Sequence, residues 1–143
     1  MKTVVFDIDG TLADVQWRRH LVESRPKRFD KFHDAMTDDP PRDEIIELCN
    51  LYYNAGWEVL IFTGRPESHR QQTTTWLAKH GVQYAQLHMR TMDRQYDPDN
   101  EIKQDMLNGL NRKVHVAVDD RQKVVNMWRE NGVVCLQCDV GDF

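Results

Sequence analysis

Two aspartates, Asp7 and Asp9, stand one residue apart at the end of the apolar run 4–6. β-Branched and aromatic residues such as these favour a strand buried on both faces, so Asp7 is expected at its C-terminal tip. Ligands of open parallel sheets bind at that edge, and Gly10 permits a sharp turn or a close approach of the backbone to a ligand. Because burying unpaired charge is costly, metal binding or catalysis explains these carboxylates better than packing does.

Two further apolar runs, 59–62 and 114–118, also end in residues capable of chemistry, namely Thr63, Arg65, Asp119 and Asp120. The carboxyl ends of parallel strands share one edge, so these residues are expected to meet Asp7 and Asp9 there. Four carboxylates in one crevice repel one another unless a divalent cation lies among them, and all-oxygen ligation favours Mg²⁺. Lys103, near the start of a later helix, adds a positive charge. Such a set of groups is typical of phosphoryl transfer.

The elements that must position these residues alternate between strand and helix. Strands are expected at 3–6, 59–62, 84–88, 114–118 and 133–136, and helices at 41–55, 67–80, 99–110 and 121–131. This alternation is typical of a three-layer, Rossmann-like α/β fold with helices on both faces of a parallel sheet. With 143 residues, 40% of them hydrophobic, the chain is expected to form a single domain over residues 1–143.

The sequence Asp7-Ile8-Asp9-Gly10-Thr11 resembles the first motif of the haloacid dehalogenase superfamily of phosphohydrolases. Matches to the second, third and fourth motifs follow in order, namely Thr63, Lys103 and Asp119-Asp120. The resemblance therefore spans residues 7–120, and it implies a haloacid dehalogenase-like fold.

Each matched residue receives a role from this resemblance. Asp7 would attack phosphorus to form an aspartyl-phosphate. Asp9 would protonate the leaving oxygen and later take a proton from the hydrolytic water. Thr63 and Lys103 would hold the phosphoryl oxygens.

The resemblance also implies a Mg²⁺ site whose ligands are Asp7, the backbone carbonyl of Asp9, and one or both of Asp119 and Asp120. Of the last two we favour Asp120 as the direct ligand. One of the pair could instead cap the helix that follows.

The superfamily inserts its cap between the first two strands, which here places it at residues 14–57. This segment is short, so we expect a small helical cap, with Pro26 dividing the helical stretch 15–38 into two parts. A small cap would leave the crevice open to macromolecular ends and to nucleotides.

A narrower pattern concerns the substrate. Its parts are Arg18 eleven residues after Asp7, Thr-Gly-Arg at 63–65, Asp99 four residues before Lys103, Asp-Asp-Arg at 119–121 and Val-Val-x-Met-Trp-Arg at 124–129. Together they are similar to the phosphatase half of bacteriophage polynucleotide 3′-phosphatase/5′-kinase. In that family the arginines matching Arg18 and Arg65 contact the substrate phosphate, and we add Thr11 and Gly64 as substrate-binding residues. The resemblance implies removal of 3′-phosphate from DNA or RNA ends.

The kinase half of that family needs a G-x-x-x-x-G-K-[ST] loop, which does not occur in this sequence. We therefore expect a phosphatase alone, with a separate kinase or ligase as a possible partner. The sequence does not determine the oligomeric state. Two rival functions remain: a nucleotidase or other small-molecule phosphatase of the same superfamily, and a non-catalytic phosphate-binding module. The intact set of motif residues speaks against the second.

Ordinary structural roles compete with several of these assignments. Arg18 and Arg65 could face solvent, and Asp99 could cap the helix of Lys103. Tryptophans more often belong to the core, but Trp17 lies near the expected entrance and could stack on a nucleobase.

Net charge, cysteine content and the distribution of apolar residues argue against several classes of protein. A net charge of −4 argues against broad binding to a nucleic-acid backbone, although residues 18–31 form a locally basic segment. Cys135 and Cys138 form a C-x-x-C sequence, yet three cysteines in all favour reduced thiols over a disulfide framework. With no signal peptide or membrane-length apolar run, we expect a cytoplasmic protein with no membrane partner.

Overall fold

The computed structural model describes residues 1–18, 21, 31 and 34–141. Its strands are β1 (Thr3–Phe6), β2 (Glu58–Pro66), β3 (Gln86–Arg90), β4 (Val116–Arg121) and β5 (Val134–Gly141). Its α-helices are α3 (Asp43–Asn54), α4 (Arg70–Lys79), α5 (Asp99–Asn108) and α6 (Gln122–Glu130). The described residues also form four 3₁₀ helices: η1 (Gln16–Arg18), η2 (Ala35–Asp38), η3 (Glu67–His69) and η4 (Met92–Arg94).

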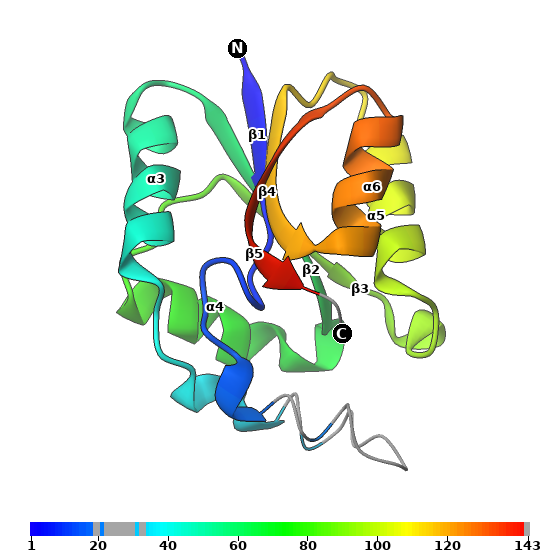
Figure 1. The fold of residues 1–143 in the computed structure, drawn as a ribbon. Coiled ribbons are helices and arrows are strands. Elements are labelled where there is room, and N and C mark those ends of the chain that lie inside the picture. Colours follow the sequence, from blue (N-terminus) through cyan, green and yellow to red (C-terminus); the bar gives the residue numbers. More distant parts are fainter. Residues whose placement is uncertain (19–20, 22–30, 32–33, 142–143) are drawn as a thin grey trace.

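The strands form one parallel sheet in the order β3-β2-β1-β4-β5. Helices α3 and α4 lie on one face and α5 and α6 on the other (Figure 1). Each face of the sheet has its own hydrophobic core, and alternate residues of β1 belong to different cores. Val4 and Phe6 pack toward α3 and α4, while Val5 packs toward α5 and α6. The predicted three-layer α/β fold is confirmed.

Four strands run further than predicted at their carboxyl ends. The prediction ended them at residues 62, 88, 118 and 136, whereas β2 continues to Pro66, β3 to Arg90, β4 to Arg121 and β5 to Gly141. Backbone pairing needs no apolar side chain, so a strand can outlast its apolar run. The register of β2 against β3 shifts between Phe62 and Pro66, which shows an irregularity where the sequence becomes polar. Such irregularities often re-aim side chains next to active sites.

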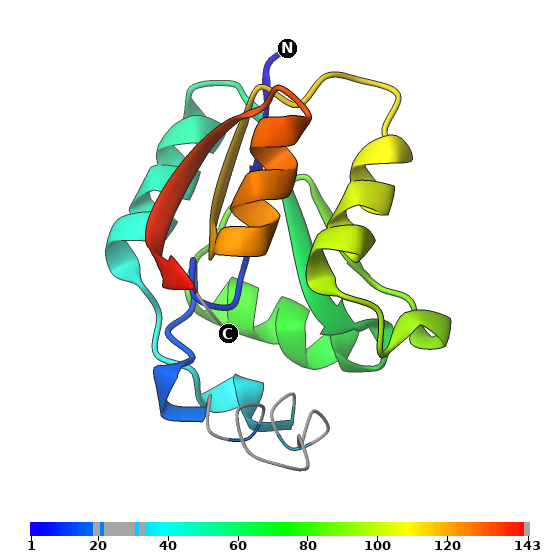
Figure 2. The same ribbon diagram turned by 45° about the vertical axis from the view of Figure 1, so that its right-hand side comes forward.

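The predicted cap segment, 14–57, divides into two parts. Helix α3 packs against the sheet through Ile46 and Cys49 and belongs to the helical layer. The 3₁₀ helices η1 and η2 instead lie side by side beyond the carboxyl ends of the strands (Figure 2). Pro26, the predicted break, falls outside the described residues.

The two thiols of the C-x-x-C sequence lie on opposite faces of the sheet. Cys135 belongs to the core under α5 and α6, and Cys138 packs against the core under α3 and α4. They are both free and do not form a shared two-thiol site. Within the described part of the chain, no helix is both long and apolar enough to span a membrane.

Candidate active site

Asp7 sits just beyond β1, buried among polar partners. Its carboxylate accepts hydrogen bonds from Lys103 Nζ at 2.7 Å and from the Thr11 hydroxyl at 3.1 Å. The chain then turns at Gly10, whose φ is +86°. A Cβ atom there would stand 2.0 Å from Oδ2 of Asp120, so the turn needs glycine both for its backbone and for space. Thr11, predicted to bind substrate, is buried and orients Asp7.

Three buried carboxylates gather at this point. Ligand oxygens of Asp7, Asp119 and Asp120 all lie within 4.8 Å of one another. Lys103 in α5 reaches into the group and donates to Asp7 and to Asp119, the latter at 2.9 Å. Strand order explains the meeting, because β4 lies next to β1 and both end at the same edge. We call these four residues the acidic cluster.

Burial and mutual repulsion disturb the ionisation of this cluster. Burial raises the pKa of Asp7 well above its ordinary value, and the charge of Asp119 adds to the rise. Burial and Asp119 also raise the pKa of Asp120 to about 7. Burial alone would lower the pKa of Lys103, but the surrounding carboxylates outweigh it and raise that pKa well above its ordinary value. The cluster therefore holds more negative charge than its one lysine balances.

The donor set fits a magnesium ion. Its ligand atoms are all carboxylate oxygens, which Mg²⁺ prefers. Oδ1 of Asp120 is buried and has no hydrogen-bond partner among the described residues. Asp119, by contrast, accepts bonds from Lys103 and from the backbone N–H of Asp120. Asp120 is thus the better candidate for direct contact. Neither aspartate caps α6, whose N-cap residue is Arg121 and has no side-chain capping bond.

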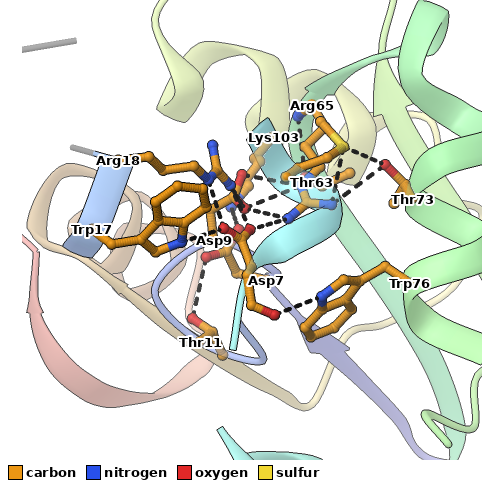
Figure 3. A network of polar contacts seen from close by, with 12 residues as sticks. Asp7, Asp9, Thr11, Trp17, Arg18, Thr63, Arg65, Thr73, Trp76 and Lys103 are labelled. Atoms are coloured by element: carbon orange, nitrogen blue, oxygen red, sulfur yellow. Dashed lines mark hydrogen bonds and ion pairs between the residues drawn. The ribbon is translucent and has the colours of Figure 1, made fainter. Parts of the chain in front are cut away.

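The carboxylate of Asp9 lies between two arginines (Figure 3). Its Oδ1 accepts from Arg18 Nη2 at 3.0 Å and from Arg65 Nη2 at 2.7 Å. Both guanidinium groups are fully buried, so neither arginine is a solvent-facing residue. The Asp9 side chain is thus engaged by the arginines, and the predicted metal contact concerns the Asp9 backbone carbonyl.

A second carboxylate, Asp39, joins the two arginines, and the sequence analysis missed it. Its oxygens accept from Arg18 Nε and Nη2, both at 2.7 Å, and from Arg65 Nη2 at 3.1 Å. Asp39 is 3% exposed. Asp9, Arg18, Asp39 and Arg65 form what we call the arginine cluster, with two charges of each sign. Burial raises the pKa of Asp39, and its arginine partners oppose that rise.

Asp99 and Gly64 form the boundary of the acidic cluster. Asp99 stands 3.5 Å from Lys103 Nζ and 3.4 Å from Arg90 Nη2, and its side chain does not cap α5. A Cβ on Gly64 would lie 2.1 Å from Asp99, so glycine allows this close approach. Arg90, which the sequence analysis also missed, donates from Nε to the Gly64 carbonyl at 2.8 Å.

Thr63 is buried within β2, inside the irregular stretch. Its hydroxyl oxygen accepts from the backbone N–H of Arg65 at 3.1 Å. Nine of the ten predicted site residues therefore fall into, or touch, the two clusters: Asp7, Asp9, Thr11, Arg18, Gly64, Arg65, Lys103, Asp119 and Asp120. Thr63 joins them through Arg65.

Comparison with known proteins agrees with this geometry. The model of the polynucleotide kinase PNKP phosphatase domain matches residues 1–143. The chain belongs to this phosphatase family. It is a phosphohydrolase of the haloacid dehalogenase superfamily, as the motifs predicted, and a phosphoric monoester hydrolase.

Two solved structures contain chains that are 30% and 31% identical in sequence to this one. A chain of the Pnkp1/Rnl/Hen1 complex is 30% identical with a TM-score of 0.83, covering 99% of this chain and 47% of that one. A chain of the Pnkp1/Rnl/Hen1 RNA repair complex is 31% identical with a TM-score of 0.81, covering 99% and 43%. The present chain thus spans less than half the length of these neighbours.

A more distant structure shares the fold. The haloacid dehalogenase-like hydrolase from Streptococcus pneumoniae is 15% identical with a TM-score of 0.68, over 96% of this chain and 84% of that one. The helical layers and sheet are therefore those of the superfamily.

Proposed function

We propose that the protein is a Mg²⁺-dependent phosphatase that removes 3′-phosphate from nucleic-acid ends through an aspartyl-phosphate on Asp7. The observation that carries the proposal is the acidic cluster, in which Asp7 lies 2.7 Å from Lys103 and beside two further buried aspartates. A site with this excess of negative charge suits a cation and a phosphoryl group that share it.

In the proposed reaction, a carboxylate oxygen of Asp7 attacks phosphorus while the bond from phosphorus to the 3′-oxygen breaks. Asp9 donates a proton to that leaving oxygen. Asp9 then takes a proton from a water molecule that attacks the acyl phosphate, which releases inorganic phosphate and restores Asp7.

The other residues hold the phosphoryl oxygens and the cation. Lys103 supplies a fixed positive charge beside Asp7, and Thr63 approaches from β2. Asp7, Asp120 and the main chain of Asp9 would hold Mg²⁺, with Asp119 behind them. When bound, the ion would offset the carboxylate charge and stabilise charge that develops on the phosphoryl oxygens.

The assignment of a nucleic-acid 3′-end rests on the family. The PNKP phosphatase model matches the whole chain, and one similar structure is described as an RNA repair complex. Arg18 and Arg65, which contact Asp9, would bind the substrate phosphate in this proposal. By analogy with the assemblies of its neighbours, the protein would act with separate repair partners such as a kinase or ligase.

Substrate comparison tests the proposal. Phosphate release would be measured with a 3′-phosphorylated oligonucleotide, a 3′-mononucleotide and a 5′-mononucleotide, each with and without Mg²⁺. We expect Mg²⁺-dependent release and a higher kcat/KM for the 3′-phosphorylated substrates. Preference for the 5′-mononucleotide would keep the phosphatase chemistry and overturn the end-repair assignment. No release from any substrate would favour a non-catalytic phosphate-binding module.

A further inference from the structure

Trp17 differs from the buried tryptophans of this chain. Trp76 and Trp128 are 2% and 1% exposed and fill the two cores, whereas the side chain of Trp17 is 47% exposed. Trp17 lies in η1, at the carboxyl edge of the sheet and directly before Arg18 (Figure 3). An aromatic side chain that is half exposed beside a reaction centre is a surface on which a ligand can pack.

The ring of Trp17 is held in place by one hydrogen bond. Its Nε1 donates to Oδ1 of Asp39 at 2.9 Å. The same oxygen accepts from Arg18 Nε at 2.7 Å, so the indole edge and the guanidinium meet at one atom. Arg18 in turn contacts Asp9 at 3.0 Å. The exposed ring is therefore linked through the Asp39 carboxylate to Arg18, which the proposed function assigns to the substrate phosphate.

Asp39 itself is fixed from behind. Its backbone carbonyl accepts from Trp76 Nε1 at 3.0 Å, and its N–H donates to the carbonyl of Met36 at 3.2 Å. The Asp39 carboxylate is buried, and the side chains that donate to it come from two other elements. Trp17 and Arg18 belong to η1, and Arg65 belongs to β2. A buried carboxylate with this many donors can set the orientation of all three side chains at once.

We infer that Trp17 stacks on the nucleobase adjoining the scissile 3′-phosphate, and that Asp39 fixes this indole in register with Arg18 and Arg65. The inference rests on the proposed function, since it requires a substrate that carries a base. Stacking is tolerant of sequence because every base presents a π-face. The subsite would thus recognise a nucleoside without selecting its base.

Removal of the base provides the test for Trp17. Two 3′-phosphorylated oligonucleotides are compared, one complete and one abasic at its last position. The wild type should prefer the complete substrate, and Trp17→Ala should lower the ratio of the two kcat/KM values by roughly 5- to 100-fold. Trp17→Phe, which keeps an aromatic face, should retain most of the ratio.

Asp39→Asn tests the positioning role. Because Asp39 orients both arginines as well as the indole, this variant should lower kcat/KM for the abasic substrate by about 10²-fold and for the complete substrate by more. In an Arg18→Gln/Arg65→Gln background the same substitution should add little for the abasic substrate, as expected if Asp39 acts on it through the arginines. Asp38→Asn, an exposed neighbour of the same type, is the matched control and should leave both rates unchanged.

The outcomes separate this inference from the proposed function. A wild-type enzyme that turns over both substrates equally, or a Trp17→Ala variant with an unchanged ratio, would overturn the stacking role and leave the 3′-phosphatase standing. A full additional loss from Asp39→Asn in the double-arginine background would overturn its positioning role. No turnover of either substrate by the wild type would overturn the proposed function, and the inference with it.

Discussion

The acidic cluster and the arginine cluster are both buried and adjoin each other, yet their charges are arranged in opposite ways. In the acidic cluster Asp7, Asp119 and Asp120 surround a single lysine. In the arginine cluster two carboxylates face two guanidinium groups at distances of 2.7 to 3.1 Å. The first therefore carries excess negative charge, while the second is balanced by its own side chains.

This difference in charge balance indicates different roles for the two clusters. A cluster with unbalanced charge is unstable by itself, and it gains stability when a cation or a proton enters. A balanced cluster needs neither, and its arginines keep a fixed geometry in the absence of ligand. We infer that the acidic cluster holds the nucleophile Asp7 and the cation, whereas the arginine cluster positions the substrate and the proton-transferring Asp9. Substitutions in the two clusters should therefore affect stability with opposite signs.

The largest expected effect comes from Asp7→Asn. Loss of the nucleophile should reduce turnover by about 10⁴-fold or more. In the absence of metal the variant should also melt at a higher temperature than the wild type, because one of three repelling carboxylates becomes neutral. Phosphate release and thermal unfolding measure the two effects. Turnover close to that of the wild type would contradict the role of Asp7, and a lower melting temperature would contradict the excess of charge.

Arg65→Gln should act in the opposite direction on stability. It leaves Asp9 and Asp39 with one arginine between them, which should destabilise the fold by about 3 kcal/mol. It should also lower kcat/KM by about 10²-fold through loss of substrate positioning. Denaturant unfolding and steady-state kinetics provide the measurements. Arg112→Gln, which breaks a surface pair with Glu58, is the control and should change stability by less than about 1 kcal/mol. Equal effects of the two substitutions would refute a structural role for the buried arginine cluster.

Asp99→Asn should have a smaller effect, because Asp99 contacts Lys103 at 3.5 Å from the margin of the acidic cluster. We expect a loss of about tenfold in kcat/KM, the order found for residues that orient direct ligands. The loss should fall mainly on kcat, since Lys103 and not the substrate-binding arginines is disturbed. A change confined to KM would instead place Asp99 in direct contact with substrate.

The smallest effect is the pH dependence of the metal-free protein. The pKa of Asp120 is raised from its ordinary 3.8 to about 7, so between these values the folded state holds a proton that the unfolded state has released. The stability that this proton supplies is complete below pH 3.8 and declines as the pH rises toward about 7. We therefore expect the melting temperature of wild type, relative to Asp120→Asn, to fall over this range.

Mg²⁺ should reverse that decline. Binding to ionised carboxylates strengthens as protons leave, so the ion should stabilise the wild type more at pH 8 than at pH 5. Asp120→Asn should show a much smaller response to Mg²⁺. A wild-type melting temperature that changes with neither pH nor Mg²⁺ would contradict the assignment of Asp120 as a metal ligand.

The acidic cluster was predictable because its signals are local. An apolar run that ends in aspartate marks the carboxyl end of a strand, and the parallel sheet then brings Asp7, Asp119 and Asp120 together. Lys103 was identified because it stands where the third motif is expected along the sequence. The sequence also located all five strands, and most clearly the central strands β1, β2 and β4, because buried parallel strands read as short apolar runs.

The arginine cluster was predicted only in part, because its key contacts are not local. Asp39 stands in the polar stretch 38–41, which reads as a turn, and its partners Arg18 and Arg65 lie 21 and 26 residues away. Nothing in the neighbouring residues marks it as buried. Arg90 was missed for a similar reason, since it contacts the carbonyl of Gly64 on the neighbouring strand, 26 residues away in the sequence. The carboxyl ends of β2, β3, β4 and β5 were misplaced because backbone pairing continues where the apolar pattern stops.

The central claim is that Asp7 becomes phosphorylated within the acidic cluster. The most direct measurement is acid quenching of the enzyme during turnover of a 3′-oligonucleotide labelled in its phosphate, followed by peptide mapping of the protein-bound label. We predict Mg²⁺-dependent label on the peptide that contains Asp7, released by hydroxylamine as expected for an acyl phosphate, increased in Asp9→Asn and absent from Asp7→Asn. Turnover by the wild type with no label on Asp7 under any quench condition would contradict the account.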